Sequence, residues 1–518
     1  MNYDHRILTA ILALAATLPA QQPRTIHGSG NPILSDGSYY SADPAPVVAN
    51  DTLYILAGRD EAPPSVNDFI MNEWQIFATK APASHTWQHY PGILRPEQVF
   101  KWAATGRAYA GQIIQGTDKR YYLYAPVEEA NSPNRDAFGI GVAVADSPLG
   151  PWQDAHPAGP IISQSVPEKN SIQNIDPTPY LDSDGRVYIF WGTFGRLLGM
   201  ELAPDMVTPR GPEVSIHGLT GFFEAPWFFH RGSSYYMIYA GNQAGPMSPC
   251  TPAVYHACIA YATAPAPFGP WTYQGVILPP VSSTTSHPGA IEFRGQWYLI
   301  YHTADAKGGG HFRRSVAIDK MQWDDSVSPA RILKVQPTRA PQPPAPPSRN
   351  LAPAAHAHAS NEPVPLQYWI AALNDGIVRS NPLPPDMWCT WSPNNPATQW
   401  AEYTWDHAVT LNASRIYFWA DHPAGANEGV APPASWHLEY WTGSAWLAVP
   451  HPTDYPTQLD QFNEVHFDPI TTTRLRAVFN ASGSEGHYAA IAVQEWEALA
   501  TTRIALARCR RGQEPSGP

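Results

Sequence analysis

Four polar residues recur at the same position of a repeated segment. Asp43, Asp176, Glu224 and His287 each stand eleven or twelve residues before a tyrosine in an aromatic-rich run. Those tyrosines are Tyr54, Tyr188, Tyr236 and Tyr298. Equal offsets place residues at equivalent points of equivalent strands, so we expect three carboxyl groups and one imidazole to converge.

Paired carboxyl groups can hydrolyse a glycosidic bond. One stays ionised and activates water or attacks carbon, while the other protonates the leaving oxygen. Glu224 is the predicted general acid, because the surrounding sequence FFEAPW is apolar and burial raises the pKa of a carboxyl group. Asp43 is the predicted general base, and Asp176 is expected to orient Glu224 and help keep it protonated. Each of these residues, taken alone, also fits a purely structural role. The residues do not decide whether hydrolysis inverts or retains the configuration of the anomeric carbon.

The elements that must position these residues form a five-fold repeat. Each copy has an apolar strand, a polar turn and an aromatic-rich strand, and successive marker tyrosines are 68, 66, 48 and 62 residues apart. In the second copy, marked by Tyr122, the polar position falls at Ala110 or Gly111. Four-stranded units repeated around an axis make a β-propeller. We therefore predict an all-β protein with a five-bladed propeller over residues 24–335.

A proline-rich run divides the chain. Residues 336–349 read QPTRAPQPPAPPSR, which is typical of a semi-rigid linker. Residues 350–500 contain short runs of alternating apolar and polar residues, which predict a β-sandwich. Residues 501–518 are basic and then polar, and are expected to be a tail.

The N-terminus is typical of an export signal. Residues 1–6 end in a positive charge, residues 7–16 are apolar, and small residues around Ala20 offer a cleavage site. We expect a signal peptide over residues 1–20 and a secreted protein. No later stretch reaches the ~20 apolar residues needed to span a bilayer, so no membrane anchor is expected.

The amino-acid composition narrows the classes of ligand that the protein is expected to bind. The formal charge is −12, which disfavours a nucleic-acid partner, and 12% aromatic residues suit a neutral sugar ligand. The four cysteines are Cys250, Cys258, Cys389 and Cys509, of which the first two are close enough to staple one loop. Their spacing disfavours a zinc site. The sequence leaves the oligomeric state open.

The site segments read SADP, IDPTPYLDSDGRVYIFWG, FFEAPWFF and SHPGAIEFRGQWYLIYH, and they resemble glycoside hydrolase family 43. Members of that family are five-bladed propeller glycosidases, and the resemblance covers about residues 28–335. It implies an inverting mechanism with Asp43 as general base, Glu224 as general acid, and Asp176 as pKa modulator and orienter.

The resemblance also implies further site residues. Arg314, in HFRRSVAID, matches an arginine near the sugar, and Phe223 and Trp227 complete the predicted substrate-binding set. His287 is expected near the axis, where many members hold a calcium ion, often through water. No cofactor is expected to be required for the chemistry.

The pattern looks most like members that act on arabinose-decorated xylan or arabinan. An α-L-arabinofuranosidase acting on an oligo- or polysaccharide is therefore the first prediction. A β-xylosidase or an arabinanase on the same scaffold is the alternative, and a non-catalytic sugar-binding propeller is a third hypothesis.

The second part resembles the coagulation-factor type C, discoidin-like fold, a jelly roll that overlaps with carbohydrate-binding modules. Trp388, Trp391 and Trp400 are candidates for a sugar-stacking platform. They fit the packing of the core or of the domain interface equally well, so no binding site is assigned there.

Overall fold

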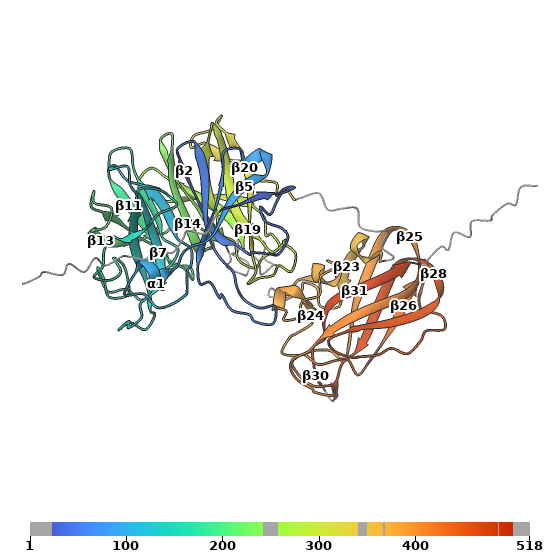
Figure 1. The fold of residues 1–518 in the computed structure, drawn as a ribbon. Coiled ribbons are helices and arrows are strands. Elements are labelled where there is room, and N and C mark those ends of the chain that lie inside the picture. Colours follow the sequence, from blue (N-terminus) through green and yellow to red (C-terminus); the bar gives the residue numbers. More distant parts are fainter. Residues whose placement is uncertain (1–22, 242–256, 340–349, 366–367, 485, 501–518) are drawn as a thin grey trace, which may run out of the picture.

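The computed structural model describes residues 23–241, 257–339, 350–365, 368–484 and 486–500. Strands dominate these residues, and the predicted all-β class is confirmed. Five sheets form a propeller, and a second β-rich region follows it along the chain (Figure 1). None of the helices in the described part of the chain is long and apolar enough to cross a membrane.

The propeller blades are antiparallel sheets that follow one another in sequence. Blade 1 contains β2 (Ala42–Ala49), β3 (Thr52–Gly58), β4 (Trp74–Thr79) and β5 (Thr86–Leu94), with β1 (Arg24–His27) on its outer edge. Blade 2 contains β6 (Gln112–Gln115), β7 (Tyr121–Glu128), β8 (Phe138–Ala145) and β9 (Gln153–Asp154). Blade 3 contains β10 (Thr178–Leu181), β11 (Val187–Trp191), β12 (Leu198–Leu202) and β13 (Pro209–Ser215).

The last two blades complete the ring. Blade 4 contains β14 (Phe222–Arg231), β15 (Ser234–Gly241), β16 (Cys258–Ala264) and β17 (Thr272–Leu278). Blade 5 contains β18 (Gly289–Phe293), β19 (Gln296–Thr303) and β20 (Ser315–Met321). A short pair, β21 (Trp323–Asp324) and β22 (Arg331–Ile332), follows. The helical turns are α1 (Pro96–Val99), η1 (Pro82–Ser84), η2 (Ala352–Ala354), η3 (Ile370–Leu373) and η4 (Pro384–Asp386).

The first strand of each blade lies next to the propeller axis. Strand β6 contacts both β2 and β10, β10 contacts β14, and β18 contacts β2. Asp43 lies on β2 and Glu224 on β14, while Asp176 and His287 stand two residues before β10 and β18. The repeated sequence position therefore corresponds to one end of the innermost strands.

The N-terminal segment joins the first and last blades. The backbone N–H of Ile33 donates to the carbonyl of Val316 at 2.8 Å, and that of Ser41 donates to the carbonyl of Arg314 at 2.8 Å. The Asn31 side chain donates to the carbonyl of Ile318 and accepts from its N–H, both at 2.9 Å. These bonds extend blade 5 and hold Arg314 in register with the segment that leads to Asp43.

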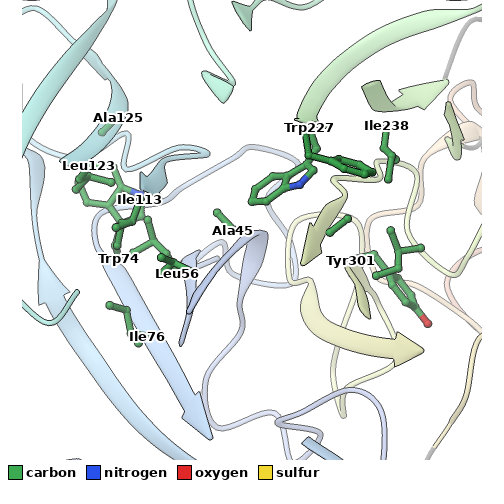
Figure 2. Packing of buried hydrophobic residues seen from close by; sticks show 14 of the residues in the cluster. Ala45, Leu56, Trp74, Ile76, Ile113, Leu123, Ala125, Trp227, Ile238 and Tyr301 are labelled. Carbon is green, nitrogen blue, oxygen red and sulfur yellow. The ribbon is translucent and has the colours of Figure 1, made fainter. Parts of the chain in front are cut away.

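Apolar side chains from different blades interdigitate into a continuous core. Leu56 and Trp74 from blade 1, Leu123 from blade 2, Trp227 from blade 4 and Tyr301 from blade 5 belong to one buried cluster (Figure 2). Burial of this apolar surface is the main force that holds the blades together.

The second region is built on two long strands. Its main sheet contains β23 (His356–Ala359), β24 (Trp388–Cys389), β25 (Thr398–Trp419), β26 (Ser435–Trp441), β27 (Trp446–Ala448), β28 (Phe462–Asn480) and β31 (Ala492–Ala500). A small hairpin pairs β29 (Gly483–Ser484) with β30 (His487–Tyr488). The rings of Tyr403 and Trp496 stack 4.1 Å apart in its core. This arrangement is consistent with the predicted sandwich, whose limits at residues 350 and 500 stay predictions.

The tryptophan and cysteine predictions have different outcomes. Of the three candidates for a stacking platform, Trp388 is fully buried in the core of the second region, which is the packing alternative, whereas Trp391 is 44% exposed. Cys389 is buried and free. Cys258 is disulfide-bonded, and Cys250, which the sequence places close enough to pair with it, lies outside the described residues.

Leu299→Ala should lower the free energy of unfolding of the propeller by about 2–5 kcal/mol, because Leu299 is fully buried and the substitution leaves a cavity. Leu333→Ala is the matched control, since Leu333 is 38% exposed and its truncation should cost less than about 1 kcal/mol. Urea unfolding followed by tryptophan fluorescence measures both. Equal losses in the two variants would contradict the described core.

Candidate active site

Irregular backbone shapes the ends of the strands that carry two of the predicted acids. Asp43 lies where the pairing of β2 with β3 shifts between Ala42 and Ala45, and its φ is 54°. Glu224 lies between two register shifts in β14, and the next residue, Ala225, has a φ of 57°. Bulges of this kind redirect side chains out of the regular alternation and are frequent beside active sites.

The three predicted acids come together from three blades. Asp43, Asp176 and Glu224 are all within electrostatic reach of one another, because the charge of Asp43 acts on both other carboxyl groups. Asp176, like Asp43, has a left-handed backbone conformation, with a φ of 57°. The structure therefore brings together the set that the repeat predicts.

A buried arginine links the site to blade 1. Arg314, only 3% exposed, donates from Nη1 to Oδ1 of Asp43 at 2.9 Å. Its other edge binds the carboxylate of Asp60 in a bidentate manner, with distances of 2.9 and 3.0 Å. Asp60 also accepts the backbone N–H of Arg314 at 2.8 Å, so the guanidinium has a fixed position between two carboxylates.

Asp43 is held in its ionised form. Burial alone would raise the pKa of its carboxyl group, but the positive charge of Arg314 and its hydrogen bond outweigh burial, and the pKa lies below its ordinary value. An ionised carboxylate that accepts a proton from water is what a general base requires.

Glu224 has the opposite ionisation. Burial raises its pKa to about 7, and the negative charge of Asp43 adds to this effect. The hydroxyl of Thr193 donates to Oε2 of Glu224 at 2.9 Å and opposes the shift by stabilising the carboxylate. Near neutral pH this side chain therefore has a proton that it can donate.

Asp176 interacts with both of the other acids. Its Oδ2 accepts the backbone N–H of Ala225, the residue after Glu224, at 3.0 Å. Burial, and then the charges of Glu224 and Asp43, raise its pKa well above the ordinary value. Because Asp176 and Glu224 repel each other when both are ionised, the pair retains a proton, and the bond to Ala225 fixes the backbone that carries Glu224.

Two histidines flank Asp43 without adding charge. Burial lowers the pKa of His287 to about 4 and that of His302 to about 3, so both are neutral at pH 7. Nδ1 of His302 accepts the backbone N–H of Asp43 at 3.2 Å, which suits a neutral ring. Arg314 is therefore the cation that controls Asp43.

The surroundings of His287 do not fit a calcium ion held directly by side chains. Calcium takes six to eight oxygen ligands, whereas His287 offers nitrogen and Asp43 is already bound to a guanidinium. No group of three or more histidine, cysteine or acidic side chains within the described ranges is placed to hold a metal. A direct metal role of His287 is thus not supported, and a role through water stays a prediction; Nδ1 of His287 lies 3.9 Å from Oδ1 of Asp43.

The two predicted substrate-binding aromatics differ in position. Phe223 is half-buried, and its ring packs edge-on against Phe194, which is 68% exposed, at a centroid distance of 5.5 Å. This pair forms an apolar rim beside Glu224. Trp227 is only 6% exposed and belongs to the hydrophobic core, so its predicted contact with substrate is not supported.

Several functional neighbours were not found from the sequence. Asp60, His302, Thr193 and Phe194 lie outside the repeated position, and only folding brings them to the acids. The sequence contains a local signal only for His302, which is the last residue of the run YLIYH that begins at the marker tyrosine Tyr298.

One ionised carboxyl group and one that keeps a proton, brought together by the inner strands of a five-bladed propeller, are the pair that an acid–base hydrolase requires. Comparison with known proteins gives the family. Residues 29–328 match the model of glycosyl hydrolases family 43. The chain belongs to this family and is a glycosidase.

Individual relatives are similar over the propeller. A xylosidase/arabinosidase of Bacteroides ovatus is 30% identical over 57% of this chain and 95% of its own length. An arabinoxylan arabinofuranohydrolase of Bacillus subtilis is 28% identical over 57% of this chain and 62% of its own length. The structure of the GH43_1 enzyme from Xanthomonas citri complexed with xylose has 25% identity and a TM-score of 0.49, over 60% of this chain and 94% of that chain.

The value of kcat/KM for an aryl glycoside should fall as the pH rises above about 7, because Glu224 then loses the proton that it must donate. Thr193→Val removes a hydrogen bond that stabilises the Glu224 carboxylate, so this alkaline limb should move to higher pH. The pH–rate profiles of the two proteins measure the shift.

Thr193→Ser is the matched control, because it keeps the hydroxyl and should keep the limb in place. An alkaline limb that stays where it is in Thr193→Val would show that this hydrogen bond does not control the charge of Glu224.

Proposed function

We propose that this protein is an α-L-arabinofuranosidase that removes arabinose from arabinoxylan or arabinan with inversion of configuration. The observation that carries the proposal is that the two acids differ in ionisation. Arg314 holds Asp43 ionised, while burial raises the pKa of Glu224 to about 7. The names of the relatives from Bacteroides ovatus and Bacillus subtilis support arabinose as the sugar.

The proposed mechanism assigns one task to each acid. Asp43 accepts a proton from a water molecule while the oxygen of that water attacks the anomeric carbon. Glu224 donates its proton to the departing glycosidic oxygen. Asp176 holds the Glu224 backbone through Ala225 and favours the protonated acid by charge repulsion. Arg314 lies close enough to stabilise the Glu224 carboxylate formed after the transfer. Water then restores both protonation states, and no cofactor enters the cycle.

A β-xylosidase is the second candidate. The Bacteroides ovatus relative is named both xylosidase and arabinosidase, and the two sugars present similar hydroxyl groups to a pocket of this kind. An arabinanase is a third candidate. It is supported by an endo-arabinanase of Bacillus subtilis that is 25% identical over 49% of the length of that enzyme.

The proposal also includes a role for the N-terminal segment and for the second region. The N-terminal pattern supports export, with residues 1–20 as signal peptide; those residues lie outside the described part of the structure. The long paired strands β25 and β28 and the sandwich-like core support a discoidin-like domain over residues 350–500.

Asp43→Asn and Glu224→Gln should each lower kcat/KM on the better of nitrophenyl arabinofuranoside and nitrophenyl xylopyranoside by at least ~100-fold, because each removes one acid–base group. Asp146→Asn and Glu168→Gln, exposed elsewhere on the propeller, are matched controls and should retain activity. Absorbance of released nitrophenol measures all five proteins.

Near-wild-type activity in both site variants would overturn the assigned roles. The same wild-type reaction, followed by proton NMR, tests inversion: the first sugar released should have the opposite anomeric configuration to the substrate. A retained configuration would exclude Asp43 as the base that activates water.

A further inference from the structure

A pocket lies between the propeller and the second domain. Its volume is about 230 Å³, many times the ~10–15 Å³ that one water molecule needs. The propeller contributes residues 308–313 and the neighbourhood of Pro64 and Asn67, and the second domain contributes residues 377–381. The space is therefore large enough for a sugar-sized group and is formed by both domains.

Hydrogen bonds across the interface fix the two walls. Ser380 Oγ donates to the carbonyl of Pro64 at 3.2 Å, and Asn381 Nδ2 donates to the carbonyl of Ser65 at 3.3 Å. Arg379 Nη1 donates to the carbonyl of Gly309 at 3.2 Å. The first two bonds tie the loop of the second domain to the blade 1 loop between β3 and β4, and the third ties it to the glycine-rich loop of blade 5.

A carboxylate of the second domain reinforces the junction. Asp386 accepts a hydrogen bond from Nε2 of His311 in the propeller and one from Nε of Arg379 at 2.8 Å. Both partners are mostly buried, so this contact excludes water and holds its geometry better than a surface ion pair.

Each wall is also anchored within its own domain. The backbone N–H of Gly376 donates to Glu495 and that of Arg379 to Gln494, both at 2.9 Å. On the propeller side, Gly310 and Arg313 exchange backbone hydrogen bonds in a tight turn. The pocket is therefore preformed rather than created by a ligand.

The pocket contains a cation without an acidic partner. Arg313 donates only to the backbone carbonyls of Gly308 and Pro63, and within the described ranges no carboxylate forms an ion pair with it. A β-carbon placed on Gly310 would lie 3.1 Å from Nη2 of Arg313 and 3.4 Å from Nη1 of Arg379. Two guanidinium groups thus meet at one point, and Asp386 neutralises only that of Arg379.

The pocket adjoins the catalytic acids. Arg313 immediately precedes Arg314, which binds Asp43. Phe312, in the pocket wall, packs against Phe69 at a centroid distance of 4.7 Å, and Arg314 lies over the same Phe69 ring at 4.9 Å. The pocket wall and Arg314 therefore share the Phe69 ring as a neighbour.

We propose that the pocket is a substrate subsite that binds the carboxylate of a uronic acid substituent near the cleaved sugar, with Arg313 as its specificity-determining residue. The inference deepens the proposed function and rests on it. A guanidinium offers two parallel N–H donors that match a carboxylate, and neutral sugar hydroxyls cannot replace that pairing. The second domain thereby becomes part of the substrate site rather than a separate module.

The test compares kcat/KM for two arabinosylated xylo-oligosaccharides, one with and one without a glucuronic acid substituent next to the arabinose. Arg313→Gln should lower the ratio of acidic to neutral substrate by on the order of tenfold or more, the usual loss for a hydrogen bond to a charged group. Ile377→Trp, which fills the pocket from the second domain, should lower the same ratio. Arg294→Gln, at an exposed ion pair with Asp51, is the matched control and should not change it.

Other outcomes are decisive as well. Equal losses on both oligosaccharides in Arg313→Gln would overturn carboxylate recognition, and an equal loss on a nitrophenyl arabinofuranoside would move Arg313 into the catalytic pocket. If the wild type cleaves none of these substrates, the proposed function fails. Calorimetric titration of the Asp43→Asn variant with the two oligosaccharides then tests the pocket independently of cleavage. Tighter binding of the acidic oligosaccharide that is lost when Arg313→Gln is added would support the proposed subsite. Equal binding of the two oligosaccharides would overturn it.

Discussion

The buried guanidinium of Arg314 is the interaction on which the rest of the site depends. A charge with 3% exposure is costly unless it is paired, and Arg314 is paired twice, to Asp60 and to Asp43. This pairing lets Asp43 remain ionised although its carboxyl group is buried. The same negative charge then helps Glu224 to keep its proton, so one cation separates the ionisation of two carboxyl groups.

The fold serves this arrangement by supplying each member from a different blade. Asp43, Asp176 and Glu224 stand at one end of three inner strands, and blade 5 delivers Arg314 across the ring closure. Bulges and left-handed residues at these positions carry backbone strain, which the interdigitated core of the propeller can sustain. The second domain contacts the loop that precedes Arg314, so it borders the site as well.

The repeat in the sequence was enough to predict the propeller and the meeting of the acids, because equal spacing fixes equivalent positions in equivalent blades. It could not predict Asp60 or His302, since their roles arise from contacts between strands far apart in the chain. The core position of Trp227 could not be predicted for a related reason. The register shift between Glu224 and Trp227 changes the alternation of side chains, and the indole enters the core.

The most direct test of the account is the acidic limb of the pH–kcat/KM profile in Asp60→Asn and in Asp60→Asn/Arg314→Met. The shared Asp60→Asn change keeps the second variant from leaving an Asp60 carboxylate without its partner, so the two variants differ in the cation beside Asp43. If Arg314 holds Asp43 ionised, removing it should move the acidic limb upward by at least about one pH unit, the usual effect of losing an adjacent opposite charge. An acidic limb at the same pH in both folded variants would contradict the account.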